Sequence, residues 1–224
     1  MSTSNVAVNE AGNDLFRKEV NTLCLDYLLM ETIPLSLRVT KTLSDSSKGV
    51  PTQGIRQLKI DPKKPEEEDL LFRSGGIDIL LDDTAIQDEN SIFRIESYGY
   101  EIGTKLADCL IYMKSDGNLQ ISQPLDIMKF ICRDVWKLLY SKQMDNLRTN
   151  HSGTFVLIDH NFRLISNMAS PLGDPDTLKR ASLYLWFPCG IIRGILFSLG
   201  LEASVHAEIT QFPSVSFNIQ TNQS

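Results

Sequence analysis

The sequence contains little histidine and none of the common catalytic motifs. Its three histidines are His151, His160 and His206; the first two fall in predicted turns and the third on the polar side of a predicted strand. All three are therefore expected to be solvated rather than to act as bases. A G-x-S-x-G elbow, an H-E-x-x-H zinc motif and a G-x-x-x-x-G-K-[ST] phosphate loop are also missing. The sequence thus predicts a protein that is not an enzyme and has no catalytic residue, cofactor or metal site.

Cysteine is scarce as well. The four cysteines, Cys24, Cys109, Cys132 and Cys189, are far apart and form no C-x-x-C pair. Such spacing excludes the usual structural zinc and redox motifs. Each cysteine lies in an apolar run with helical periodicity, so we expect four reduced, buried thiols. A thiol enzyme using Cys132 or Cys189 is the remaining catalytic alternative.

Positive charge and long apolar runs are also lacking. The net charge is −6 and no dense Lys/Arg cluster is present, which argues against a nucleic-acid partner. The longest apolar stretch, Leu183 to Leu199, is interrupted by Pro188, Gly190, Arg193 and Gly194, whereas a membrane span needs about 20 apolar residues. The polar N-terminal residues do not resemble a secretory signal. We expect a cytoplasmic protein whose membrane association is peripheral only.

The most distinctive feature that is present is an apolar helix near the N-terminus. Residues 1–13 are small and polar and are expected to form a disordered tail. From residue 15 onward, apolar residues recur with helical spacing in two neighbouring stripes, through Pro34 and up to about Val39. The first stripe contains Phe16, Val20, Leu23, Tyr27 and Met30, and the second contains Leu25, Leu28, Leu29 and Ile33.

A helix with two apolar stripes needs cover on two sides. Burying three or four of these side chains is worth roughly 5–10 kcal/mol gross, so some other surface must cover them. Helices of the same chain could supply this cover, but they are few relative to the apolar faces that must be hidden. We therefore predict that a partner protein covers part of the first helix, and that the interface contains Phe16, Val20, Leu23, Tyr27, Leu28 and Met30.

A segment rich in proline, glycine and acidic residues, residues 44–90, follows this helix. It combines Pro51, Pro62 and Pro65 with the acidic run Glu66–Asp69 and the pair Gly75-Gly76. This composition argues against a packed core. We expect a disordered insertion within a single domain that spans residues 14–224. The short apolar pieces 70–72 and 77–81 could form brief helices that dock only with a partner.

Two more helices are predicted after this insertion. Ser91 is the predicted N-cap of the first, and Gly99 and Gly103 lie on one of its faces, a spacing that permits close helix packing. The second helix begins near Pro124. The apolar face of the first contains Ile95, Ile102, Leu106, Cys109, Leu110 and Met113, and that of the second contains Leu125, Met128, Cys132, Val135 and Leu139.

The period of the apolar residues then changes from about 3.6 to 2. Residues 144–150, 154–158 and 162–165 have the pattern of strands joined by short turns, and the chain ends with two more alternating strands at 203–210 and 214–220. Short connections require antiparallel pairing, and strict alternation needs apolar cover on only one face. The predicted fold class is α+β: an α/β plait with a twisted antiparallel sheet and helices packed on one face.

One charged residue interrupts the last apolar helix, which is predicted at about 188–199 with Gly200 as its C-terminal cap. Arg193 lies within the run Cys189–Gly194 (CGIIRG). Burying a guanidinium without a partner is strongly unfavourable. We expect Arg193 to pair with an internal carboxylate, to reach the surface, or to contact a partner.

Five segments carry a family resemblance. Phe130–Trp136 (FICRDVW), Lys142–His151 (KQMDNLRTNH), Gly153–Phe155 (GTF), Gly99–Gly103 (GYEIG) and Cys189–Gly194 are similar to motifs in the small subunits of the transport protein particle (TRAPP), a tethering complex of the secretory pathway. The resemblance is to the subunit 6 branch, whose yeast member is the 33-kilodalton subunit. The matching motif positions with an expected structural role are Gly99, Gly103, Arg148, Asn150, Gly190, Arg193 and Gly194.

This resemblance implies an α/β plait whose first helices form a heterodimer interface with a TRAPP subunit 3-type chain. It also implies assembly with further TRAPP subunits into a core that promotes nucleotide exchange on a Rab1/Ypt-type GTPase, at Golgi and ER–Golgi membranes. The subunit would act as a scaffold, and its membrane association would be peripheral and only through the complex. Exchange needs no nucleophile, because the assembly has only to bind the nucleotide-free GTPase better than the loaded one.

The chain departs from the sister subunit 3 branch at one point. That branch has an acylated cysteine in the loop before the helix that begins near Pro124, whereas residues 114–123 contain no cysteine here. Acylation of that kind is therefore not expected. The alternative function is a small hydrophobic-ligand or haem-sensing domain of similar fold, although no histidine is well placed as an axial ligand.

Overall fold

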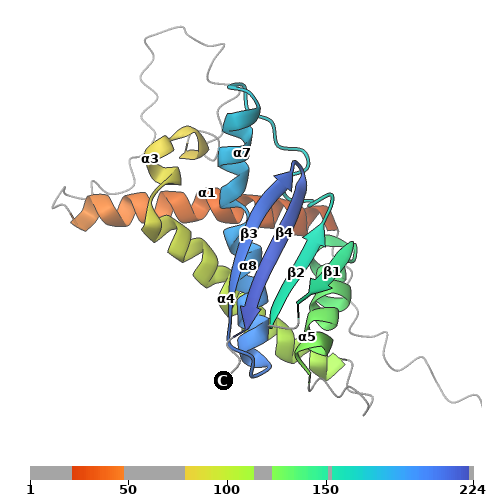
Figure 1. The fold of residues 1–224 in the computed structure, drawn as a ribbon. Helices are drawn as coiled ribbons and strands as arrows, with labels where there is room; N and C mark the ends of the chain where they lie inside the picture. The colour runs from red at the N-terminus through yellow and green to blue at the C-terminus, as the bar shows by residue number, and fades with distance from the viewer. Residues whose placement is uncertain (1–21, 48–78, 114–122, 151–152, 222–224) are drawn as a thin grey trace, which may run out of the picture.

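One antiparallel sheet lies against a layer of helices (Figure 1). This computed structural model describes residues 22–47, 79–113, 123–150 and 153–221. The sheet contains β1 (Asn146–Thr149), β2 (Thr154–Asp159), β3 (Ala203–Gln211) and β4 (Ser214–Thr221) in the order β1-β2-β4-β3. All neighbouring strands are antiparallel. The predicted α+β class, with an antiparallel sheet covered by helices, is confirmed.

The strand register shows why the alternating segments form this sheet. Val205 is opposite Ile219, and Leu157 is opposite Phe217; these side chains are buried against the helices. The alternate residues turn to the other face of the sheet; those of the edge strand β3, such as His206, are exposed, whereas Ser216 of the central strand β4 is buried. One apolar face and one more polar face are what a period of two produces in a sheet with helices on a single side.

The strand predicted at residues 162–165 is not present. These residues form consecutive turns, in which the N–H of Ile165 donates to the carbonyl of Phe162 at 3.2 Å. Phe162, Leu164 and Ile165 are nonetheless buried. The prediction was wrong because a short apolar run can fill a core as a turn as well as a strand.

The helices are α1 (Thr22–Ser47), α3 (Asp83–Ile86), α4 (Glu89–Met113), α5 (Pro124–Phe130), α7 (Asp174–Leu183) and α8 (Trp186–Ser198). Helix α5 continues through a π-helical turn, η2 (Ile131–Val135), into α6 (Trp136–Tyr140). Figure 1 shows α8 behind β3 and β4, and α4 crossing beyond the free edge of β3. Helix α7 was not predicted, although Asp174, Pro175 and Asp176 are suited to a helix N-terminus.

Helices α4 and α8 are in very close contact through glycine. A Cβ atom added at Gly99 would lie 2.2 Å from the carbonyl oxygen of Phe187, and one at Gly194 would lie 2.2 Å from that of Tyr100. A Cβ atom added at Gly103 or at Gly190 would lie 2.3 Å or 2.1 Å, respectively, from a backbone carbonyl oxygen of the opposite helix. Only glycine permits two helix backbones to approach so closely. This packing holds α4 beside α8 although no strand covers α4.

The buried face of α4 differs in part from the predicted one. Its buried residues are Ser91, Ile95, Gly99, Gly103, Ala107 and Leu110, and the two glycines among them contact α8. Of the predicted face, Ile95 and Leu110 are buried and Leu106 is partly buried against the core, whereas Ile102, Cys109 and Met113 are exposed. The helix also begins before Ser91: the Asp88 carboxylate accepts hydrogen bonds from the N–H of Ser91 at 3.2 Å and from its hydroxyl at 3.0 Å.

The expected insertion at 44–90 is shorter than predicted at both ends. Helix α1 extends to Ser47, and Ile79, Ala85 and Ile86 belong to the core. Arg180 of α7 donates to the carbonyl oxygen of Leu80 and so fixes this segment. Residues 48–78 and the tail 1–13 lie outside the described residues, as do predicted positions Phe16, Val20 and His151.

One helical stretch among the described residues, Asp174–Ser198, has the length and composition of a membrane span. Of the 18-residue window in this stretch that has the required hydropathy, 72% is buried inside the fold. This burial is typical of the core helix of a folded domain.

Candidate docking surface

Helix α1 has one face in the core, and its exposed side carries several large apolar side chains together with the ion pair Glu31–Arg38. Leu29, Ile33 and Leu37 are buried among the core residues. The exposed large apolar side chains of the same helix are Leu23 (53% exposed), Tyr27 (69%), Leu28 (64%), Leu35 (47%) and Leu43 (52%). A helix with apolar side chains on both faces is expected where a second surface covers the outer one.

The structure divides the predicted interface residues into three groups. Leu23, Tyr27 and Leu28 are exposed, and Met30 is half-buried. Phe16 and Val20 are outside the described residues. Leu35 and Leu43 were missed, because the helix was predicted to end near Val39 and Leu35 follows Pro34. The spacing of seven between Leu28 and Leu35, two helical turns, was the signal that could have found Leu35.

Exposed apolar side chains also occur on α4, which the sequence prediction did not include in the interface. Ile102, Cys109 and Met113 are spaced by seven and four residues and therefore share a face. Phe93 and Tyr112 are exposed on other faces of the helix. Together, α1 and α4 carry more exposed apolar surface than scattered single side chains would give.

The outer face of α1 is held rigidly by contacts of the inner face. Asp26 forms an ion pair with Arg163, in the turn after β2. Near the other end, the Nε of Arg94 on α4 donates to the hydroxyl of Thr40 at 3.0 Å, and Lys41 pairs with Asp82 at 2.9 Å. A surface fixed in this way loses little conformational entropy on binding.

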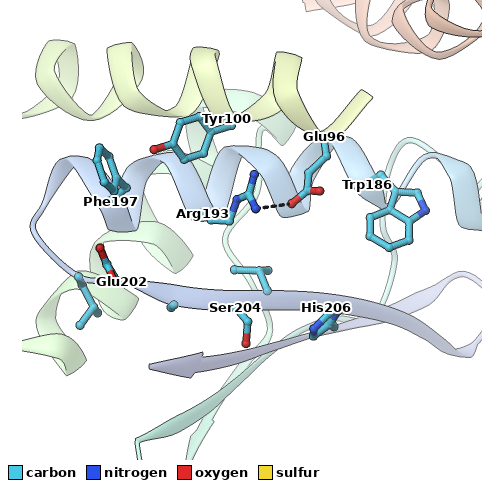
Figure 2. A pocket seen from close by; sticks show the side chains of 11 residues that line it. Glu96, Tyr100, Trp186, Arg193, Phe197, Glu202, Ser204 and His206 are labelled. Atoms are coloured by element: carbon cyan, nitrogen blue, oxygen red, sulfur yellow. Dashed lines mark ion pairs between the residues drawn. The ribbon is translucent and has the colours of Figure 1, made fainter. Parts of the chain in front are cut away.

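Arg193 is paired with an internal carboxylate and also reaches the surface. Its Nη1 is 3.2 Å from the Glu96 carboxylate on α4, and its side chain is 39% exposed. Its guanidinium carbon lies 5.1 Å from the centre of the Tyr100 ring, within cation–π range. Figure 2 shows Arg193 between Tyr100 and Glu96. Its Nε is buried and has no hydrogen-bond partner among the described residues.

A buried carboxylate links α6 to β2. Asp159 is fully buried and accepts hydrogen bonds from the indole N–H of Trp136 at 2.8 Å, the ammonium of Lys142 at 2.5 Å and the N–H of Asn161 at 2.9 Å. Burial would lower the pKa of Lys142, but its bonds to Asp159 and Asp145 outweigh this effect and raise the pKa. This network therefore fixes the helix against the sheet.

Asp145, the residue directly before β1, extends this network. Its carboxylate accepts the N–H of His160 at 2.6 Å and lies 3.3 Å from the Lys142 ammonium. Partial burial would raise the pKa of Asp145, but these two donors outweigh burial and lower it. The family-like segment 142–151 therefore contains residues that join α6, β1 and β2.

Two other family-like positions lie in and just after β1. The Asn150 side chain accepts the N–H of Thr154 at 2.8 Å and so supports the turn between β1 and β2. Arg148 is exposed opposite Val156 of β2.

The centre of the core is filled with aromatic rings. The rings of Trp136, Tyr140, Phe162 and Phe217 pack with centroid separations from 4.5 Å to 6.0 Å. These are ordinary distances for packed aromatic pairs.

The thiols differ in exposure, and the prediction that all four are buried was wrong for two of them. Cys24 and Cys109 are exposed, Cys132 is half-buried and Cys189 is buried. Burial raises the pKa of Cys132 and of Cys189 to about 12. Both are therefore protonated at neutral pH, and a protonated thiol is a poor nucleophile. Among the described residues, no three His, Cys, Asp or Glu side chains form a cluster that could hold a metal ion.

The fold and this surface define a class: an α+β domain with an exposed apolar helix face suited to docking. The family model "Transport protein particle (TRAPP) component" matches residues 25–222. The chain belongs to this TRAPP component family.

Its relatives agree with the resemblance to subunit 6. Human trafficking protein particle complex subunit 6B is 38% identical over 134 residues, which are 60% of this chain and 80% of that protein. Human subunit 6A is 39% identical over 129 residues, which are 58% and 77% of the two chains. The predicted similarity to the subunit 6 branch is confirmed.

A solved structure shares the fold. The crystal structure of a trafficking protein particle complex subunit 3 from Naegleria fowleri, covalently bound to palmitic acid, superposes with a TM-score of 0.55 at 13% identity. The match covers 91% of this chain and 98% of that one. At this identity the likeness establishes the fold alone.

Proposed function

We propose that this chain is a non-catalytic scaffold subunit of a TRAPP-like vesicle-tethering complex, and that it docks through the exposed face of α1. The single observation that carries the proposal is the group of five exposed large apolar side chains on α1, outside the face that is already buried in the core. Covering Leu23, Tyr27 and Leu28 is worth about 1.5–3 kcal/mol each before the cost of association.

The partner proposed for this face is a TRAPP subunit 3-type chain, in a heterodimer. Membership of the TRAPP component family and the shared fold of a subunit 3 structure support this choice. Within the complex, the chain would contact further subunits and contribute to nucleotide exchange on a Rab1/Ypt-type GTPase in ER-to-Golgi and Golgi trafficking. It would be cytoplasmic, and peripheral at these membranes only through the complex.

A scaffold role is consistent with the chemistry of the described residues. The raised pKa values of Cys132 and Cys189 make them poor nucleophiles. A small-ligand or haem sensor would need room at the centre of the core, where Trp136, Tyr140, Phe162 and Phe217 pack on one another. Promoting exchange, in contrast, needs only differential binding of two states of the GTPase.

The proposal is tested by placing a charge on the exposed face of α1. In Leu28→Asp the carboxylate would be buried at the interface, so we expect the dissociation constant of the heterodimer to rise at least about thirtyfold, equivalent to about 2 kcal/mol. The measurement is titration of the purified variant against a TRAPP subunit 3-type chain. The free variant should unfold at the same urea concentration as the wild type, because Leu28 is exposed.

Leu172→Asp is the matched control. Leu172 is 70% exposed, as Leu28 is 64% exposed, but it lies in the loop before α7. It should bind as the wild type does. Wild-type affinity for Leu28→Asp, or equal losses in both variants, would refute docking through α1.

A further inference from the structure

Three open grooves lie end to end along β3. The first, about 560 Å³, lies between β3, α4 and α8 and is seen in Figure 2. The second and third, about 570 Å³ and 500 Å³, continue past α7 to the end of the strand. Trp186 and His206 line both the first and the second groove, and Leu178 and Ile209 line both the second and the third. The grooves therefore adjoin one another along the strand, and together they are called here the β3 trough.

β3 is an edge strand of the sheet, because the strand order is β1-β2-β4-β3. Every second residue of an edge strand turns its N–H and C=O away from its neighbour. The N–H of Thr221 in β4 donates to the carbonyl of Gly153 at 3.0 Å, on the β2 side of β4. By alternation, Val215, Phe217 and Ile219 also bond to the β2 side. Their partners in β3, which are Ala203, Val205, Ala207 and Ile209, therefore turn their N–H groups outward. The nine residues of β3 span about 30 Å.

The helix layer extends further than the sheet on this side. Figure 1 shows α4 beyond the free edge of β3, and the glycine contacts hold α4 against α8. Trp186 and Phe197 of α8 and Tyr100 of α4 line the trough beside the free edge. An added strand would lie about 4.8 Å from β3 and would cover part of this surface. Addition of an extended peptide to such an edge is a recurrent recognition mode.

The charges of the trough favour a basic ligand. Four carboxylates line it, those of Glu96, Asp174, Glu202 and Glu208, against the two cations Lys179 and Arg193. Both cations are already paired, Arg193 with Glu96 at 3.2 Å and Lys179 with Asp83 at 3.0 Å. Asp174, Glu202 and Glu208 have no ion pair with any residue that the structure describes. One oxygen of Glu208 accepts hydrogen bonds from the Ser216 hydroxyl at 3.1 Å and the Asn218 amide at 3.4 Å, and these neutral donors leave its charge unpaired.

We propose that the β3 trough takes an extended, basic segment of a neighbouring subunit, which adds to the sheet as a fifth strand beside β3. The inference rests on the proposed function in one respect, since it assumes that the chain works within an assembly. It concerns a different surface from α1, and the two surfaces can be tested separately. The backbone of the segment would pair with β3, and its lysine or arginine side chains would face Glu202 and Glu208.

The first test is amide hydrogen exchange of the full chain, alone and in its purified assembly. We expect the outward amides of Ala203, Val205 and Ile209 to exchange at least about tenfold more slowly in the assembly, because each gains an acceptor. Assembly without this protection would overturn the trough inference but leave the proposed function intact. Failure to assemble at all would overturn both. Protection that rises with concentration in the isolated chain would show instead that a second copy occupies the edge.

The second test is the charge requirement. The double variant Glu202→Lys/Glu208→Lys should release one subunit from the assembly at lower potassium chloride concentration than the wild type, with an affinity reduced about five- to tenfold. Glu101→Lys, an exposed position of α4 outside the trough, is the matched control and should behave as the wild type. Identical salt release of the double variant and the wild type would contradict a basic occupant.

Discussion

Replacing Gly194 with valine is expected to prevent stable folding of the chain. The first added atom would lie 2.2 Å from the carbonyl oxygen of Tyr100, which is backbone and cannot rotate away. Helices α4 and α8 would have to separate along their whole contact, which includes Gly99, Gly103 and Gly190. Such overpacking exceeds the usual cost of about 1–3 kcal/mol, and we expect a loss of at least about 4 kcal/mol.

The smaller change Gly194→Ala distinguishes packing from helix propensity. Alanine stabilises a helix interior by about 1 kcal/mol relative to glycine, so propensity alone predicts a more stable protein. Steric contact predicts a loss of about 2–3 kcal/mol. Ser97→Ala, on a half-exposed face of α4, is the control and should change stability by less than about 0.5 kcal/mol. Urea unfolding decides the matter, and a stabilised Gly194→Ala would contradict the close contact.

Asp159→Ala is the second change with a large expected effect. It would leave the buried indole N–H of Trp136 without its acceptor and would leave the Lys142 ammonium with only Asp145, at 3.3 Å. Removing one partner of a buried charge pair costs about 3–5 kcal/mol. Because Lys142 is partly exposed and can reach water, we expect about 3 kcal/mol.

Asp159→Asn is the matched variant for this network. It keeps an acceptor for Trp136 but loses the charge that faces Lys142, so the destabilisation should be smaller, at about 1–2 kcal/mol. Urea unfolding followed by tryptophan fluorescence measures both variants. Equal stabilities of Asp159→Ala and the wild type would show that the network does not hold α6 against the sheet.

Local patterns were sufficient to predict the strands but not the short apolar turn. β3 and β4 alternate between apolar and more polar residues because only one face of the sheet packs on the helices, and this alternation is visible in the sequence. Phe162, Leu164 and Ile165 are buried through a turn whose form depends on the aromatic rings around it. Those rings come from Trp136 and Phe217, far away in sequence, so the run alone could not distinguish the two structures.

Distant ion pairs and backbone contacts explain the other differences. Residues 79–90 have the composition of a linker, yet Arg180 binds the carbonyl of Leu80 across 100 positions. A partner so remote cannot be found from local composition. Part of the α4 face was misassigned because Ile102, Cys109 and Met113 were grouped with the buried Ile95 and Leu110, whereas close contact with α8 selected the line of glycines.

The candidate docking surface was predictable in part. Helical spacing identified an apolar helix with more than one apolar stripe, and Leu23, Tyr27 and Leu28 are exposed. The sequence could not say which stripe the core would take. Leu28 is exposed and Leu29 is buried, and only the packing of Leu29, Ile33 and Leu37 in the core decides between neighbours.

The most direct test of docking through α1 uses a native thiol as the probe. Cys24 is exposed, one turn before Leu28 on the same face of α1. N-ethylmaleimide should label Cys24 in the free chain and leave buried Cys189 unlabelled. In the purified assembly, we expect labelling of Cys24 to slow at least about tenfold as a partner subunit covers the face. Labelling at the same rate in the assembly and in the free chain would contradict docking through α1.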